Sequence, residues 1–343
     1  MATTSASGTE FSGEIPVQSE GMGGEIPPGI GPWRLAWRRL RRNRVALFFG
    51  GLFLLIVVLC LLAPVYAHNI AHAGPADGFP DSQIHVGGTT EYVLGTTGIP
   101  IGPTWHSRFF LGADGGGRDV AVRLLYGGRN SLEIGAIATI ITMILGVLLG
   151  TVSGYLRGPT DGVIRFGLDV LWAFPAVLLG VALGVSIAVG GLGPIKGNSL
   201  FVPALVIGIV YIPYVARPVR GQVLGLRERE FVDAARQQGL SHGRIMLFEI
   251  LPNLSSTIVV FLPLILANAI LLEAGLSYLG AGVQPPNPSW GTMISDGISS
   301  IPAAFHNVLV PGIMLVLTVM SINVFGDGLR DALDPRAKVR IAH

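Results

Sequence analysis

Six long apolar stretches without any Asp, Glu, Lys or Arg dominate this sequence. Each could form a membrane-spanning helix, which needs about 20 largely apolar residues. Only 13% of the residues are charged, well below the roughly 25% of soluble domains. We therefore predict an all-α integral membrane protein with six transmembrane helices, within or near residues 45–67, 134–156, 170–195, 197–216, 250–272 and 306–326.

A seventh charge-free stretch, residues 274–295, contains QPPNPSWG. Its prolines and polar residues favour irregular structure outside the lipid rather than a span. The first apolar stretch is longer than the core of a signal peptide and lacks a convincing cleavage site, so we expect it to remain as a helix.

The arginines and lysines predict the orientation, because cytoplasmic loops are enriched in them. Of the 23 basic residues, 18 fall in the two terminal segments and in the loops after the second and fourth predicted spans. Both termini are therefore expected in the cytoplasm. The other face receives the long polar loop 68–130, including a stretch near 91–110 to which the sequence assigns no role.

The N-terminal region divides into two parts. Residues 1–32 are rich in Gly, Ser, Pro and Glu and show no apolar period, which predicts a disordered tail. Residues 33–44, WRLAWRRLRRNR, predict a basic helix at the lipid interface, with Trp at the headgroups and Arg on phosphates. The same arginines would also serve if they only fixed the topology. Residues 45–343 then form the transmembrane domain.

The predicted cytoplasmic loop 217–249 is dense in charge but also contains apolar positions. Its first part reads as a helix that ends at Gly239, a typical position for a left-handed residue. Ser241 is placed to cap a second short helix, and Pro252 marks the entry to the fifth span. Such a helical pair at the membrane surface suits docking to a soluble partner, although a solvated connecting loop has the same composition.

The chain lacks the motifs of an enzyme. Its two lysines, Lys196 and Lys338, lie outside any GxxxxGK[ST] phosphate-binding loop, and neither HExxH nor GxSxG occurs. His68 and His72 are two histidines without a third ligand, so we expect no metal site. No cofactor is expected in this chain.

At the cytoplasmic loop, the sequence resembles a known family. DAARQQG at 233–239, followed by Leu-Pro, resembles the EAA loop of bacterial ABC importer permeases, with Glu249 as a departure from the usual Ile. Four longer stretches, at 36–47, 111–135, 276–291 and 311–336, are similar to the C-type permeases of dipeptide and oligopeptide importers. The loop positions in register with the family pattern are Asp233, Ala234, Ala235, Gly239, Leu251 and Pro252.

This resemblance implies a type I importer fold in the bacterial plasma membrane and a set of partners. These are a second, similar permease, two cytoplasmic ATPase subunits that receive the loops and bind ATP and Mg, and an external solute-binding protein that delivers the substrate. Peptides are the substrate class implied most directly; nickel chelates and other small solutes are alternatives. No nucleic acid partner is expected.

Few ionisable residues mark a pathway. Glu273 is expected at the outer end of the fifth span, where it would contact the pathway or a gate, pair with or cap a neighbouring helix, or be exposed at the interface. Asn268, within the same span, is a second pathway candidate. A secondary transporter would favour acidic residues at mid-membrane and internal repeats; the sequence shows neither. A structural membrane protein is a third alternative.

Overall fold

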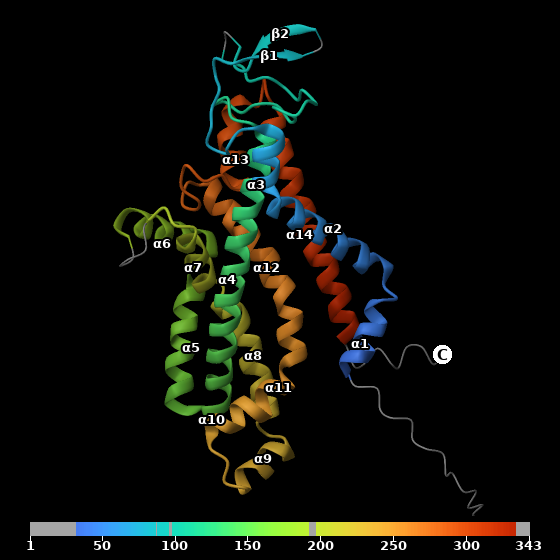
Figure 1. The fold of residues 1–343 in the computed structure, drawn as a ribbon. Helices are drawn as coiled ribbons and strands as arrows, with labels where there is room; N and C mark the ends of the chain where they lie inside the picture. Colours follow the sequence, from blue (N-terminus) through green and yellow to red (C-terminus); the bar gives the residue numbers. More distant parts are fainter. Residues whose placement is uncertain (1–31, 87, 96–97, 192–196, 334–343) are drawn as a thin grey trace, which may run out of the picture.

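The computed structural model describes residues 32–86, 88–95, 98–191 and 197–333. Apart from one short hairpin, the regular secondary-structure elements of the described chain are all helical (Figure 1). The predicted tail 1–32 lies outside this part, except for Pro32. In chain order the elements are α1 (Pro32–Leu40), α2 (Arg44–Leu61), α3 (Ala63–Tyr66), the π turn η1 (Ala67–Ala71), β1 (Gln83–Val86), β2 (Thr89–Tyr92), α4 (Val120–Leu156), α5 (Gly158–Ala173), α6 (Ala176–Gly190), α7 (Phe201–Val210), α8 (Ile212–Leu226), α9 (Glu230–Gln237), α10 (His242–Ile245), the π turn η2 (Met246–Ile250), α11 (Leu251–Asn253), α12 (Ser255–Tyr278), α13 (Trp290–Gly297), the 3₁₀ turn η3 (Ile298–Ser300) and α14 (His306–Leu333).

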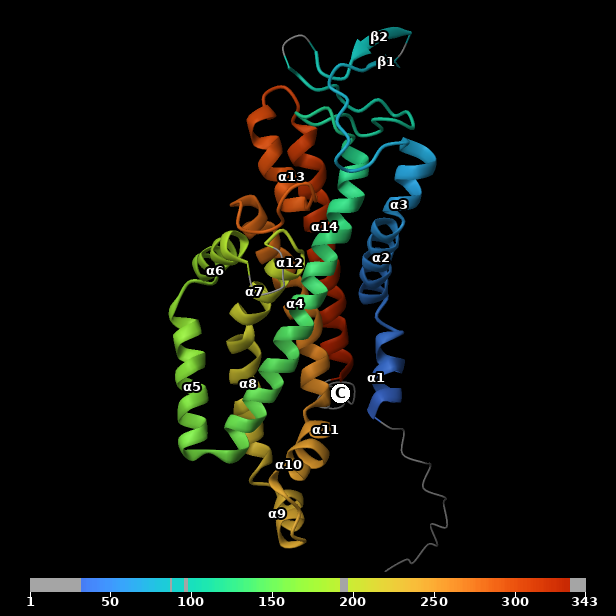
Figure 2. The ribbon, with the colours of Figure 1, turned by 60° about the vertical axis from the view of Figure 1, so that its left-hand side comes forward.

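Within the described residues, five helical segments are long and apolar enough to cross a membrane. They are α2, α4, the pair α7–α8, α12 and α14. A sixth is obtained if α5 and α6, which meet at an angle of 93°, are counted as one bent span. The hairpin β1–β2 and α13 lie at one end of the molecule, the hairpin end, and α9 and α10 lie at the other, the α9 end (Figures 1 and 2).

The predicted third span, residues 170–195, is not one continuous helix. The helix α5 begins at Gly158 and stops at Ala173, and α6 then turns away. Phe174 and Pro175 both have extended ψ angles, of 138° and 129°. A residue that precedes proline is disfavoured in helical geometry, so the break falls where Phe174 meets the ring of Pro175. The last part of the predicted span, 192–195, lies outside the described residues.

Several other predicted spans have shifted limits: the pair α7–α8 runs on to Leu226 and α14 to Leu333, beyond the predicted ends at 216 and 326. The helix α4 starts at Val120, so the final part of the predicted loop 68–130 is helical. Its N-cap is Asp119, whose side chain accepts hydrogen bonds from the backbone N–H groups of Ala121 and Val122. The helix α12 runs to Tyr278 rather than ending near residue 272. In α4 and α12, charged residues that border the apolar stretch, such as Arg129 and Glu273, belong to the helix.

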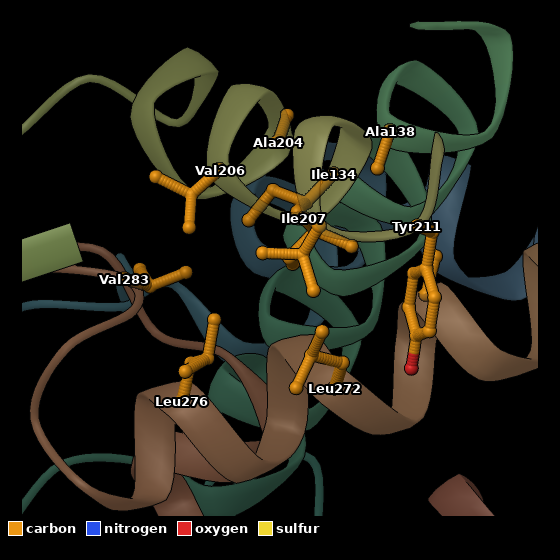
Figure 3. Close-up of a cluster of buried hydrophobic side chains, with 11 residues drawn as sticks. Ile134, Ala138, Ala204, Val206, Ile207, Tyr211, Leu272, Leu276 and Val283 are labelled. Atoms are coloured by element: carbon orange, nitrogen blue, oxygen red, sulfur yellow. The ribbon is translucent and has the colours of Figure 1, made fainter. Parts of the chain in front are cut away.

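The central helix of the fold is α4, which packs along α8 and also contacts α7, α12 and α2. Gly146, Gly150 and Gly154 form the seam with α8, where a Cβ on Gly150 would lie 2.6 Å from the backbone oxygen of Ala216. Small residues at every fourth position let two membrane helices approach closely. Figure 3 shows the neighbouring core, where side chains of α4, α7 and α12 meet around Ile207.

The segment between η1 and α4 has a small core of its own. The strands β1 and β2 pair antiparallel, with Gln83 opposite Tyr92. Below the hairpin, buried Val93, Phe109 and Ala113 pack together. We call this segment, between η1 and α4, the hairpin module. Asp119 connects it to α4, because its Oδ2 accepts a 2.7 Å hydrogen bond from the backbone N–H of Phe109 while its Oδ1 caps the helix. The segment expected to be a polar loop is therefore partly folded.

Candidate functional site

The helix α9 has one buried and one exposed face. Val232 and Ala235 are buried and join a core that also contains Val219 and Val223 of α8. Asp233 and Ala234 are exposed, and Asp233 accepts a 3.1 Å hydrogen bond from Arg236 on the same helix. The helix is therefore held on the transmembrane bundle through one face, and its other face is exposed.

Gly239 ends α9 in the manner expected from the sequence. Its φ angle is +75°, in the left-handed region. The backbone N–H of Leu240 bonds the carbonyl of Ala235, and that of Gly239 bonds the carbonyl of Arg236. These two bonds form a Schellman motif, which satisfies carbonyls that the end of a helix leaves open. A Cβ at this position would meet no atom within 4 Å, so only the backbone angle selects glycine.

The second helix of the segment is irregular. Ser241 occupies the N-cap position of α10, but its side chain makes no capping hydrogen bond. The chain continues through η2 and α11 into α12, with Pro252 in the first turn of α11. Ile245 and Ile250 point into the core, whereas Phe248 is 68% exposed. Of the two remaining family positions, Leu251 is partly buried and Pro252 is exposed.

Tyr155, near the end of α4, anchors this segment. Its hydroxyl group lies 3.2 Å from Nδ1 of His242 at the start of α10. Its backbone carbonyl accepts a 2.6 Å hydrogen bond from Arg227, just after α8. The guanidinium of Arg236 lies 5.5 Å from the centre of the Tyr155 ring. A single residue thus contacts both helices of the segment, although the sequence offers no local signal for this role.

Ion pairs at the α9 end also escape prediction from the sequence. Arg220 of α8 donates two hydrogen bonds, of 2.7 and 2.8 Å, to the carboxylate of Asp161 on α5. Arg217 pairs with Asp169 at 2.8 Å on the same two helices. Planar bidentate pairing fixes orientation as well as distance. These contacts join the first half of the bent pair to α8, and so to the seam with α4.

Glu273 is fully buried in α12, so of the three alternatives for this residue, exposure at the interface is wrong. Its Oε1 accepts a 2.6 Å hydrogen bond from Ser277, whose hydroxyl oxygen accepts another from the backbone N–H of Val283. The hydroxyls of Ser131 and Ser289 also approach the carboxyl group, but Oε2 has no hydrogen bond of standard geometry within the described chain. Glu273 therefore contacts α4, α12 and the loop before α13.

Asn268 and Glu273 are not brought together with the α9 segment. Asn268 is partly exposed, and its side chain donates a 2.7 Å hydrogen bond to the carbonyl of Leu264 on its own helix. Glu273 lies toward the hairpin end, opposite to α9. The helix α12 spans the distance between the two sites: it starts just after α11 and contains Glu273 in its last two turns. One helix thus joins the two candidate regions.

Solved structures identify the class of this fold. The chain is similar to the inward-facing MetNI methionine ABC transporter, with a TM-score of 0.52, 17% identity, and coverage of 62% of this chain and 96% of that chain. At this identity the similarity concerns the fold alone. The predicted class, an all-α membrane protein with the type I importer transmembrane fold, is confirmed.

The sequence comparisons show the family. The family model called binding-protein-dependent transport system inner membrane component matches residues 146–339. A second family model, the N-terminal TM domain of oligopeptide transport permease C, matches residues 31–79. The chain belongs to this family of ABC importer permeases, as the sequence motifs predict.

Two curated relatives show how far the likeness extends. The dipeptide transport system permease protein DppC of Alkalihalophilus pseudofirmus is 36% identical over 309 residues, 90% of this chain and 91% of the relative. The glutathione transport system permease protein GsiD of Pectobacterium atrosepticum is 35% identical over 307 residues, 90% of this chain and 92% of the relative. The similarity therefore covers nearly the whole length of these proteins.

Proposed function

We propose that this chain forms one half of the translocation pathway of a peptide importer and is driven through the α9–α11 segment by cytoplasmic ATPase subunits. The observation that carries the proposal is the construction of that segment. Its buried face is held by Tyr155 and α8, its exposed face includes Asp233 and Ala234, and its far end continues into α12. A partner that pushes on the exposed face would move a helix of the bundle.

The motion would pass along α12 as a rigid element. Allosteric transitions in packed proteins commonly use rigid-body shifts of helices. Glu273, inside the same helix, contacts the loop before α13 through Ser277 and Val283. A displacement of α12 at the α9 end would therefore alter contacts at the hairpin end. Glu273 would act as a positioning residue for that end rather than as a group that touches the substrate.

The remaining parts of the machine would be other chains. No phosphate-binding loop occurs in the sequence, so ATP and Mg would be bound by two ATPase subunits, with hydrolysis there and not here. A second, similar permease would complete the pathway, and an external binding protein would deliver the substrate, as the family description implies. With the α9 end in the cytoplasm, both chain termini would also lie there.

Peptides are the substrate class that the relatives favour. One is named for dipeptides and the other for glutathione, itself a small peptide. The nickel-chelate alternative and the secondary-transporter alternative receive no support from these names. We place the choice between a dipeptide and glutathione mainly in the external binding protein, which delivers the substrate in this proposal.

The test uses the assembled importer in vesicles, with uptake of a labelled dipeptide measured with and without ATP. Ala234→Arg adds a large charge to the exposed face of α9 and leaves the core intact. We expect it to lower ATPase co-purification and uptake at least about tenfold, because a desolvated, unpaired charge costs several kcal/mol at an interface.

Thr160→Arg is the matched control, since Thr160 is also exposed at the α9 end but lies on α5. It should transport normally. Equal ATPase recovery and uptake in both variants would contradict docking through α9. Uptake without ATP would contradict an ATP-driven importer altogether. Competition by unlabelled glutathione then separates the two peptide classes.

A further inference from the structure

The short helix α1 is firmly attached to the bundle. Ala36 and Leu40 are buried, where they pack with Ala46 of α2 and Ala332 of α14. The turn that follows is fixed by Asn43, whose Oδ1 accepts a 3.0 Å hydrogen bond from the backbone N–H of Ala46. The seam is tight, because a Cβ on Gly328 of α14 would collide with that of Ala46. The orientation of α1 is thus set by packing.

This packing leaves a cationic face exposed. Trp37 is 58% exposed, and the arginines around it are exposed too: Arg34, Arg38, Arg41, Arg42 and Arg44. None of the ion pairs found within the described part of the chain includes these five arginines. Residues 26–76 contain no Asp or Glu. We call this set the α1 basic face.

The α1 basic face borders directly on apolar surface. Immediately after Arg44, α2 exposes Val45 (59%) and Phe48 (67%), as a lipid-facing helix does. The views in Figures 1 and 2 place α1 toward the α9 end. The arginines therefore lie where the apolar part of the first span stops. Trp37 provides an amphipathic ring of the kind enriched at headgroup level.

We propose that the α1 basic face binds the phosphate groups of anionic phospholipids in the leaflet on the α9 side. Guanidinium groups pair with phosphate oxygens in a planar, bidentate geometry, and each basic residue near an anionic surface adds favourable binding. Because α1 is packed on α14, the bound lipids stabilise its position beside the last span. The proposal depends only on the chain's crossing a membrane, and not on its substrate or its ATPase.

The test is native mass spectrometry of the assembled importer released from nanodiscs that contain equal amounts of phosphatidylglycerol and phosphatidylcholine. The wild type should retain phosphatidylglycerol in preference, and added salt should reduce this retention. In Arg38→Gln/Arg42→Gln, we expect retained phosphatidylglycerol to fall at least about threefold, since two of the five cationic side chains are lost. Arg38→Lys/Arg42→Lys keeps the charge and should retain most of it.

Arg157→Gln/Arg165→Gln is the matched control, because both arginines are exposed at the α9 end but do not belong to the α1 basic face. It should bind lipid like the wild type. Equal retention of both lipids by the wild type would overturn the proposal. So would unchanged retention in correctly inserted Arg38→Gln/Arg42→Gln, which would leave the arginines with a role in topology only.

Discussion

The hydroxyl group of Tyr155 lies 3.2 Å from Nδ1 of His242, so the last turn of α4 is joined to the first residue of α10. Tyr155→Phe removes this hydrogen bond and keeps the ring that Arg236 contacts. A single hydrogen bond contributes about 0.5–1.5 kcal/mol. We expect normal membrane insertion and assembly, with peptide uptake per ATP hydrolysed reduced roughly two- to tenfold, as such an energy implies for an equilibrium.

The measurement is simultaneous ATP hydrolysis and uptake in vesicles. Tyr278→Phe serves as the control, since Tyr278 is a partly exposed tyrosine at the C-terminal end of α12, far from Tyr155 and His242. Unchanged uptake per ATP in Tyr155→Phe would show that the contact does not transmit movement.

The turn at Gly239 gives a graded prediction. Space for a side chain is open there, so the cost comes from the backbone angle alone, roughly 1–2 kcal/mol for an ordinary residue. Asn tolerates this conformation best, and a β-branched residue least. We expect ATPase recovery and uptake to fall in the order Gly239→Asn, Gly239→Ala, Gly239→Val, with uptake abolished in the last and the chain still in the membrane. A Gly239→Val variant with full uptake would remove the segment from the mechanism.

Glu273 provides a test of burial. If Glu273 were exposed at a membrane boundary, its replacement would change the stability little. The side chain is instead fully buried and hydrogen-bonded to Ser277. Glu273→Ala would leave a cavity and unpaired serine hydroxyls, so we expect a loss of about 2–4 kcal/mol of stability together with transport. Glu273→Gln keeps the shape and an acceptor and should lose much less. Thermal unfolding of the purified complex distinguishes the two; equal melting temperatures would argue for a peripheral side chain.

The pair Asp161–Arg220 should matter more than an exposed pair. Both side chains are largely enclosed and share two hydrogen bonds, so Asp161→Ala is expected to cost about 1–3 kcal/mol. Arg157 and Glu228 also pair, at 2.6 Å, but their side chains are 45% and 67% exposed. Removing that pair should cost less than about 1 kcal/mol. Double-mutant cycles on both pairs, read by thermal unfolding, would contradict this ranking if the two coupling energies were equal.

Topology is tested by thiol labelling of intact cells. Cys60 is buried, and its replacement by Ala leaves Ser107 and Ser241 as exposed positions for single cysteines. A membrane-impermeant reagent should label position 107, in the hairpin module, and spare position 241, beside α10. Labelling at 241 alone would place the α9 end outside the cell and exclude cytoplasmic ATPases as its partners.

Local chemistry explains which features the sequence could predict. The turn at Gly239 was predictable because a helix end and a left-handed glycine depend on adjacent residues. The break before Pro175 was missed because the surrounding stretch is apolar and long enough to span. The helix α5 carries Asp161 and Asp169, which place most of it outside the charge-free stretches. Their partners, Arg220 and Arg217, lie on another helix, so local sequence does not reveal the pairing.

Glu273 shows the same limit. Its burial depends on Ser131 and Ser289, which come from other parts of the chain. The role of Tyr155 likewise depends on His242, 87 positions away. Hydrophobic periodicity and composition do not depend on such distant contacts. They therefore predict most of the spans, but not which side chains of different spans contact each other.

The two hydrogen-bonding roles of Asp119 determine where the hairpin module can be cut from this protein. One carboxylate oxygen caps α4 and the other holds Phe109, in the core of the module. A fragment that ended before this residue would lose an interior contact, and a permease trimmed up to it would lose a helix cap. Transplanting the module between importers therefore requires taking Asp119 and the first turn of α4 along with it.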